Sequence, residues 1–159
     1  MAQRTWPDDW TDRRAGLDCT ICAQGRVEET RSGRRFFAGS AADVYLRTRA
    51  PLPGYSMAVW RGRHVADLAQ LSADELGAYW DDVATASRAL FQVFQPAQVN
   101  YLTYGNSVPH LHAYILLRYV DDSSPGMPLT PFVEEPVEPD ALESTLHDLR
   151  AAIRSRRVP

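Results

Sequence analysis

Residues 106–117 set the narrowest limits on how this chain can fold, because polar and apolar side chains alternate along them. Side chains of an extended strand point to opposite faces in turn, so one face would carry His110, His112 and Tyr114. The other face would carry apolar residues suited to a core, which are Leu111, Ala113 and Ile115. An amide, a hydroxyl and a proline stand just ahead of the two histidines. This pattern is typical of a phosphate site built around an imidazole, but two surface histidines on a half-exposed strand also produce it by chance. Two places upstream in the chain favour the first interpretation.

The size and composition of the chain predict a single globular domain. Its 159 residues suffice for a substantial core, and 45% of them are hydrophobic against 23% charged. A net charge of -3 argues against a general nucleic-acid binder. No apolar run is long enough to span a membrane, and the N-terminal segment lacks the apolar core of a signal peptide. The expected location is therefore the cytoplasm.

Local patterns predict both strands and helices. The β-branched and aromatic content, with the turns between, indicates strands over 34–39, 42–47, 55–60 and 98–105. A long helix is expected from Ser72 to about Phe94, because Ser72 and Glu75 fit a capping box and apolar residues recur every three or four positions. Asp140 is expected to cap a final helix that reaches about Arg154.

Three segments show no periodicity. Residues 1–18 are expected to form a loop or a short helix anchored by Trp6 and Trp10. Residues 49–54 are expected to form a loop, because they contain two prolines and a glycine. Residues 121–139 are rich in proline and are expected to wrap the domain or to reach a partner subunit.

Cys19 and Cys22 form a C-x-x-C pair. Such a pair serves as a redox centre or as half of a metal site, and a redox pair starts a helix that follows a strand. Residues 23–25 are expected to break a helix quickly, which favours a metal site. His64 alone would be taken as a surface histidine, but together with His110 it completes a Cys2His2 set. Zinc binds such a set tetrahedrally, in a closed site that holds structure and performs no chemistry.

The same assignment leaves His112 free, about 6–7 Å farther along the strand face than His110. A neutral imidazole is a competent nucleophile toward phosphorus near pH 7. Charge that develops on phosphate oxygens needs fixed donors nearby, and the candidates are Ser107, Asn106 and the backbone N–H groups of residues 105–107. The sequence therefore predicts His112 as the nucleophile of a phosphate site.

The run from His110 to Leu116 resembles the signature of the histidine triad (HIT) superfamily, in which three histidines alternate with apolar residues. Other parts of the chain fall in the family's order, namely Pro53-Gly54-Tyr55, Gly62-Arg63-His64-Val65, the helix at Ser72, Gly105-Asn106-Ser107-Val108-Pro109-His110 and Arg118. The likeness is strongest to bacterial HIT hydrolases of the dinucleoside polyphosphate type. It predicts an N-terminal extension over 1–17, a HIT-like domain over 18–125, and a Pro-rich segment with a C-terminal helix over 126–159.

This resemblance implies an α+β fold with a HIT-like antiparallel β-sheet, one long central helix and a C-terminal helix, usually in a homodimer. It implies cleavage at the α-phosphate of a dinucleoside polyphosphate or nucleoside phosphoramidate, through a nucleotidyl-histidine intermediate. In zinc-containing members the ligands fall on Cys19, Cys22, His64 and His110, which is the set reached above, and the nucleophile falls on His112. The implied substrate-binding residues are Asn100, Asn106, Ser107 and Arg118.

Two positions depart from the family pattern. Tyr114 replaces the third histidine, and a phenol with an ordinary pKa of about 10 can donate a hydrogen bond but cannot act as an imidazole acid near neutral pH. Arg47 and Thr48 stand where the family carries a ribose-binding acid, which indicates an altered nucleoside preference or a ligand other than an ordinary nucleotide.

Three functions follow from these residues. The leading one is a HIT-type nucleotide hydrolase or transferase, in which His112 attacks phosphorus, Ser107 and Asn106 orient the phosphate, and Tyr114 assists. The second is a zinc-stabilised nucleotide-binding protein with little or no turnover. The third is a thiol redox protein that uses Cys19 and Cys22.

Overall fold

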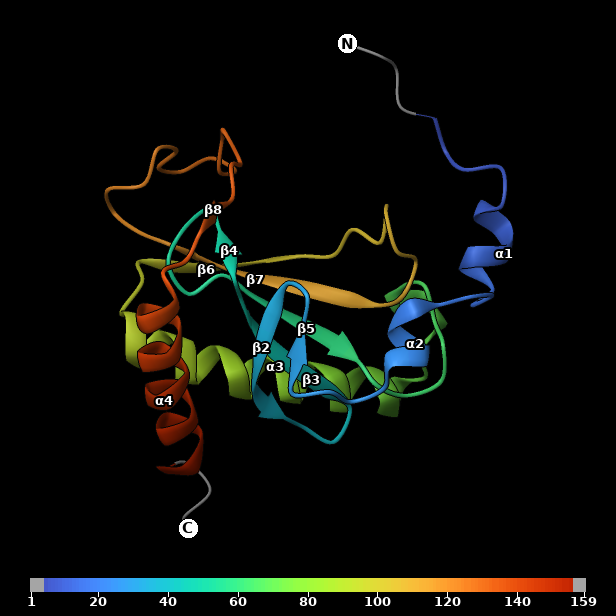
Figure 1. Ribbon diagram of the computed structural model, residues 1–159, viewed down its shortest axis with the longest axis horizontal. Helices are drawn as coiled ribbons and strands as arrows, with labels where there is room; N and C mark the ends of the chain where they lie inside the picture. Colours follow the sequence, from blue (N-terminus) through green and yellow to red (C-terminus); the bar gives the residue numbers. More distant parts are fainter. Residues whose placement is uncertain (1–4, 156–159) are drawn as a thin grey trace.

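The fold is built on an antiparallel sheet of six strands, in the order β1-β2-β3-β5-β7-β6 (Figure 1). The computed structural model describes residues 5–155, so residues 1–4 of the expected N-terminal extension and 156–159 of the C-terminal segment lie outside it. The strands of this sheet are β1 (Glu29–Thr30), β2 (Gly33–Ala38), β3 (Ala42–Arg47), β5 (Ser56–Trp60), β6 (Gln98–Leu102) and β7 (His112–Arg118). A second, two-stranded sheet pairs β4 (Arg49–Ala50) with β8 (Glu135–Pro136).

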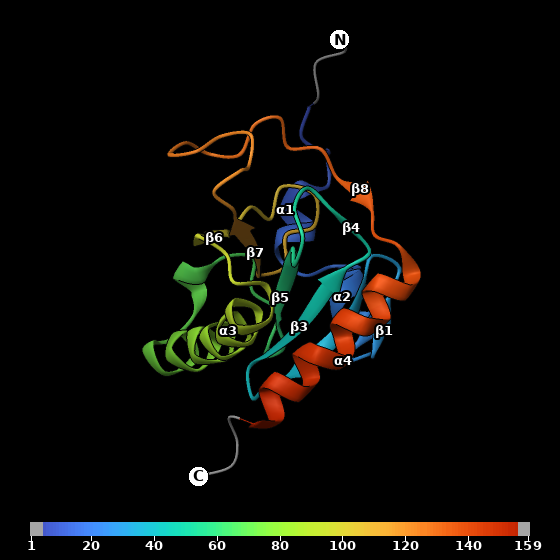
Figure 2. The same cartoon turned by 90° about the vertical axis from the view of Figure 1, so that its left-hand side faces the viewer.

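The helices differ greatly in length. Two short ones, α1 (Trp10–Arg14) and α2 (Thr20–Gln24), lie near the N-terminus, and a 3-10 turn, η1 (Leu68–Gln70), precedes the long α3 (Ala73–Phe94). The C-terminal α4 (Pro139–Ser155) lies across the end of α3 (Figures 1 and 2). Both long helices contribute to one core with the sheet, through side chains such as Tyr79 and Leu90 of α3, Leu149 of α4, and Val44 and Ile115 of the sheet.

The strand register decides which side chains lie on the other face of the sheet, away from this core. Val59 of β5 pairs with His112 of β7, and Met57 pairs with Tyr114. Side chains of paired residues in an antiparallel sheet lie on the same face. The two candidate catalytic side chains therefore lie on the face opposite α3, and the alternating residues Ala113 and Ile115 are fully buried in the core.

The predicted α+β fold, with its antiparallel sheet, long helix and C-terminal helix, is confirmed. The capping box at the start of α3 is present, because Ser72 Oγ accepts from the Glu75 N–H at 3.2 Å and Glu75 Oε2 accepts from the Ser72 N–H at 2.8 Å. These two bonds satisfy donors that the first turn of a helix would otherwise leave unpaired.

The strand that carries the histidines begins later than expected, at His112 rather than near residue 106. Pro109 has no N–H for a strand ladder, and the His110 N–H turns back to the Val108 carbonyl. The Leu111 N–H bonds to the carbonyl of Val65, outside the sheet. Residues 106–111 therefore form a loop, and His110 lies at its end instead of inside the strand.

Two further expectations differ from the structure. Helix α4 begins at Pro139, so Asp140 lies in its first turn and is not its cap, because proline is well suited to the first helical position. The Pro-rich segment, which was expected to lack regular structure, contains β8, and this strand pairs with β4. This short pairing returns the segment to the sheet end near Arg49 (Figure 2).

No helix in the described part of the chain combines the length and the apolar character needed to cross a bilayer.

Candidate active site and metal centre

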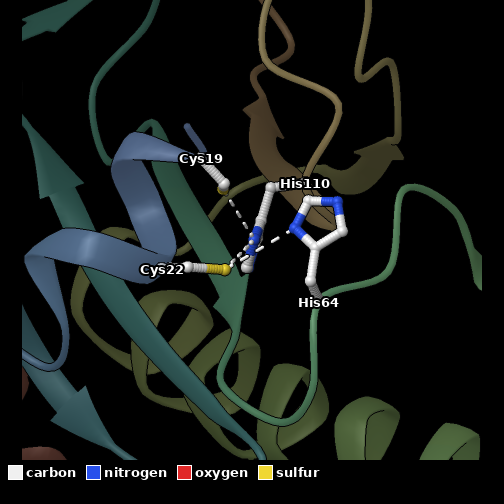
Figure 3. Close-up of side chains that lie close together, drawn as sticks. All are labelled: Cys19, Cys22, His64 and His110. Carbon is white, nitrogen blue, oxygen red and sulfur yellow. Dashed lines mark hydrogen bonds between the residues drawn. The ribbon is translucent and has the colours of Figure 1, made fainter. Parts of the chain in front are cut away.

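Four side chains from distant parts of the chain converge in one cluster (Figure 3). Cys19 caps α2 and Cys22 lies within it, His64 follows β5, and His110 precedes β7. Their ligand atoms all lie within 4.8 Å of one another. The Sγ atom of Cys22 is 3.5 Å from Nδ1 of both histidines, and Sγ of Cys19 is 3.5 Å from Nδ1 of His110. A tetrahedron with Zn–S of about 2.3 Å and Zn–N of about 2.0–2.1 Å has S···N edges of about 3.6 Å.

The two histidines present the same nitrogen to this cluster for the same reason. Nε2 of His110 is 2.9 Å from the Trp60 carbonyl oxygen, and Nε2 of His64 is 3.2 Å from the Arg14 carbonyl oxygen. A carbonyl oxygen can only accept, so Nε2 carries the proton in each ring and Nδ1 presents its lone pair. Such an outer contact fixes the tautomer and the ring orientation of metal-ligating histidines.

The thiols also fit a cation. Burial, reinforced by the neighbouring Cys19, raises the pKa of the Cys22 thiol to about 11. Two adjacent thiolates need a compensating positive charge, and a divalent ion supplies it while displacing the protons. A mixed set of two sulfurs and two imidazoles in tetrahedral arrangement is typical of zinc. The cluster is therefore compatible with zinc binding by all four residues predicted from the sequence.

Gly16 is a residue of the metal centre that sequence reasoning missed. It has a φ of +95°, and a Cβ built there would lie 2.8 Å from Cγ of His64. The ring of His64 therefore packs against a backbone position that only glycine can occupy without displacing it. No local pattern marks this glycine, because its neighbour in space is 48 positions away along the chain.

We expect a Gly16→Ala variant to retain zinc about tenfold less well, because the added methyl group pushes the His64 ring away from the cluster. Competition with a chromogenic chelator measures this retention. Gly25→Ala is the matched control: Gly25 also has a positive φ, of +66°, but no atom lies within 4 Å of its added Cβ. Equal zinc retention by the two variants would show that backbone strain, and not contact with His64, accounts for any loss.

His112 lies beside the metal centre and is coupled to it through one hydrogen bond. Its Nδ1 is 2.7 Å from the carbonyl oxygen of His110, so Nδ1–H donates and the lone pair lies on Nε2. Burial lowers the pKa of His112, and the positive charge of Arg47 lowers it further. The imidazole is therefore neutral at pH 7, in the tautomer that a nucleophile requires.

Tyr114 lies next to His112 within a group of aromatic rings. Its ring is 5.2 Å from that of His112, edge to face, and stacks on Tyr55 at 5.3 Å. Tyr104 lies 6.3 Å away, also by ring centroids. Burial raises the pKa of the Tyr114 phenol, partly offset by Arg47. The hydroxyl therefore keeps its proton at neutral pH and can act only as a hydrogen-bond donor or acceptor.

Ser107 and Asn106 lie near the histidine, as the sequence predicted. A cavity of about 330 Å³ is lined by these two residues together with His112, Tyr114, Tyr104, Gly105 and Val108. Both Ser107 and Asn106 are exposed, and Gly105 has a φ of +70° that turns the loop at this point. The cavity thus combines one imidazole, one phenol and short polar side chains.

Asn100 and Arg118 lie elsewhere. Arg118 is six residues beyond His112 on β7, or about 20 Å along the strand, and its guanidinium donates to Asp122, Asn100 and carbonyl oxygens of the following loop. Asn100 accepts from it at 3.1 Å. Both line a larger cavity of about 880 Å³, which contains neither His112 nor Ser107. The structure therefore does not bring this pair together with the histidine.

Arg47 is a second residue of the site that was not predicted from the sequence as a site residue. It lies at the end of β3 on the same sheet face as His112, because Tyr45 and Met57 are paired and side chains alternate. Its charge acts on His112, Tyr114 and Tyr55. The sequence marked this residue only by its departure from the HIT family pattern, in which a ribose-binding acid stands at this position.

The HIT domain family model matches residues 41–121, just over half of the chain. Three similar solved structures agree in fold. A histidine triad protein from Bradyrhizobium japonicum is 19% identical, with a TM-score of 0.67, 77% of this chain covered and 91% of that one. A Zn-bound histidine triad family protein from Mycobacterium smegmatis is 18% identical, with a TM-score of 0.64 and coverage of 88% and 96%.

The third structure is a hypothetical histidine triad nucleotide-binding protein from Sulfolobus tokodaii, 16% identical, with a TM-score of 0.62 and coverage of 77% and 85%. At these identities the likeness concerns the fold. A comparison with curated proteins gives no significant match.

Proposed function

Because this chain belongs to the HIT domain family, we propose that it is a nucleotide hydrolase or nucleotidyltransferase that acts at the α-phosphate of a dinucleoside polyphosphate or nucleoside phosphoramidate. The observation that carries this proposal is the 2.7 Å contact between Nδ1 of His112 and the His110 carbonyl oxygen. It leaves Nε2 unprotonated on a buried, neutral imidazole beside a cavity of about 330 Å³. The name of the Sulfolobus tokodaii relative, a nucleotide-binding protein, supports a nucleotide as the ligand.

The reaction would proceed in two displacements. The Nε2 lone pair of His112 forms a bond to the α-phosphorus, and the bond from phosphorus to the leaving group breaks with its electron pair. The leaving group takes up a proton from the solvent. Water, or another acceptor in a transferase, then attacks the phosphorus of the nucleotidyl-histidine and gives up a proton to the solvent. The bond from phosphorus to Nε2 breaks with its electron pair returning to nitrogen, which releases the nucleotide and restores neutral His112.

Charge that gathers on the phosphate oxygens would be met by the loop of residues 105–107. The Ser107 hydroxyl, the Asn106 amide and the backbone N–H groups of this loop line the same cavity as His112, and donors that are already in position stabilise such charge. Zinc, when bound by Cys19, Cys22, His64 and His110, would have a structural role, because four protein ligands leave no open position for substrate.

The first experiment is turnover on a panel of dinucleoside polyphosphates and a nucleoside phosphoramidate, followed as liberated mononucleotide. Release of mononucleotide from at least one of them supports the proposal. No release from any of them, with nucleotides still bound, would replace it with the second candidate below.

Tyr114 offers a graded test of how the leaving group is stabilised. We expect Tyr114→Phe to slow release of an amine from the phosphoramidate by about 10- to 100-fold, because a basic leaving group is stabilised during departure by the hydrogen bond that the phenol donates. Release from a dinucleoside polyphosphate should fall less, since its phosphate leaving group is stable without one. Steady-state kinetics on the two substrates measures the difference, and equal effects on both would argue against a donor role for the phenol.

The second candidate is a zinc-stabilised nucleotide-binding protein with little or no turnover. One observation favours it: burial raises the pKa of Tyr114 above that of an ordinary phenol, which makes it a poorer acid than the histidine it replaces. A Tyr114→His variant that gains turnover from an inactive parent would identify this case.

The homodimer implied by the family stays a prediction. The edge position of β6 in the sheet and the exposed Tyr101 on it offer a surface for a second copy. Light scattering on the eluting protein would measure the mass, and a single 17.9 kDa species would contradict a stable dimer.

A further inference from the structure

The Nε–H group of Arg47 is buried without a hydrogen-bond acceptor, and such a group destabilises the folded protein. Among the residues that the structure describes, its Nε is the one buried side-chain nitrogen or oxygen without a hydrogen-bond partner. Only 14% of the side chain is exposed, and its ion pair with Glu134 joins Nη2 to Oε2 at 3.6 Å, which is longer than a hydrogen bond. Buried polar groups without partners are rare and point to a missing interaction.

The position of Arg47 relates it to the site. Leu46 pairs with Ser56, so Arg47 lies opposite Tyr55, whose ring stacks on Tyr114. His112 lies two strands across from Arg47 and four residues along, or about 10 Å and about 13 Å between backbones. Both side chains lie on the same face of the sheet but line different cavities, and the one beside Arg47 has about 430 Å³ and includes Tyr55 and Glu135. A ligand that contacts both side chains must therefore extend past the rings of Tyr55 and Tyr114, which requires at least the size of a nucleotide.

One carboxylate, that of Glu134, forms an ion pair with Arg47 within the part of the chain that the structure describes. Glu134 comes from the Pro-rich segment, is 28% exposed and is held by its backbone, because its carbonyl oxygen accepts from Arg49 at 2.6 Å. Phe132 of the same segment contacts Tyr55 edge to face at 5.7 Å. The Pro-rich segment therefore covers the aromatic group at Tyr55. It also brings the Glu134 carboxylate near the Arg47 guanidinium, but not within hydrogen-bond distance of it.

We propose that Arg47 binds an oxyanion, a phosphate or a carboxylate, carried by the ligand in addition to the phosphate that faces His112. This inference rests on the proposed nucleotide function and narrows its substrate class to nucleotides with a second anionic group remote from the reacting phosphate. A guanidinium forms two parallel hydrogen bonds to such a group, which would occupy donors that the protein itself leaves free. Glu134 would lower the affinity for the same group by repulsion.

The test is calorimetric titration of the zinc-loaded protein with four probes. These are adenosine 5′-monophosphate, its 2′- and 3′-phosphorylated derivatives and its 3′-O-succinyl derivative. We expect one phosphorylated or succinylated probe to bind at least about tenfold tighter than the monophosphate. A preference for the phosphates or for the succinyl derivative identifies which oxyanion the site takes. Arg47→Met should reduce that preference to about twofold or less, and Glu134→Gln should increase it.

Arg88→Met is the control for net charge, because Arg88 is exposed on α3, on the opposite face of the sheet. Its preference should match that of the unmodified protein. Equal binding of all four probes, or a preference that survives Arg47→Met, would overturn the assignment of Arg47 and leave the nucleotide function standing. Failure of every probe to bind would count against the nucleotide function itself, and against this inference with it.

Discussion

Replacing His112 with alanine is expected to reduce release of mononucleotide by at least about 10³-fold. The variant loses the one imidazole that lines this cavity in the described structure, and with it the base that could activate Ser107, while Tyr114 stays protonated. Nucleotide affinity should change little, since the loop of residues 105–107 remains. Liberated mononucleotide measures the loss of turnover, and calorimetry measures the nucleotide affinity.

The chain provides a matched control in His147, which is exposed on α4. His147→Ala should retain full turnover. The reaction should be quenched in alkali and not in acid. This quench should yield a nucleotidyl adduct on the unmodified protein and on His147→Ala, but not on His112→Ala. Turnover by His112→Ala at the rate of the unmodified protein would exclude the nucleotidyl-histidine mechanism.

Removal of the metal is expected to have the second large effect. Replacement of both Cys19 and Cys22 by alanine should reduce bound zinc from one per chain to none and lower the free energy of unfolding by several kcal/mol. The four ligands tie α2, the segment after β5 and the loop before β7 together (Figure 3). Elemental analysis and urea denaturation measure the two quantities.

Turnover should fall with the metal although no substrate group contacts it. The His110 carbonyl oxygen sets the tautomer of His112 through the 2.7 Å contact, so a loosened His110 leaves the nucleophile less well oriented. A strong chelator should reproduce the effect on the unmodified protein and add nothing to the double alanine variant. If that variant kept its stability and its turnover, the cluster would have neither a structural nor an orienting role.

Local signals in the sequence predicted the elements well. The capping box at Ser72 and the apolar stripe that follows placed α3 to within one residue of its observed start. Alternation along the histidine segment predicted the two faces of β7, because a strand with one buried face carries the pattern in its own residues. The pattern failed at residues 106–111, where Pro109 and the bond from the Leu111 N–H to Val65 divert the backbone.

The metal set could be predicted because ligand chemistry restricts residue types so strongly. Two cysteines and two histidines with suitable spacing left few other assignments in a chain with 4 histidines, and the structure brings all four together. The carbonyl groups of Trp60 and Arg14 that orient the rings, and the glycine that makes room for His64, could not be predicted. Backbone atoms have no identity in a sequence, and these contacts cross 48 to 50 positions.

The sequence by itself determined the elements, the ligand types and the candidate nucleophile, because each depends on short-range periodicity or on the chemistry of a residue. Only the tertiary structure decided what the long arginine side chains do. Arg118 is engaged by Asp122 and the following loop, whereas Arg47 keeps a buried Nε without a partner. Asp122 approaches Arg118 through a turn in which the Asp122 N–H bonds to the Tyr119 carbonyl, and Glu134 approaches Arg47 beside the pairing of β8 with β4.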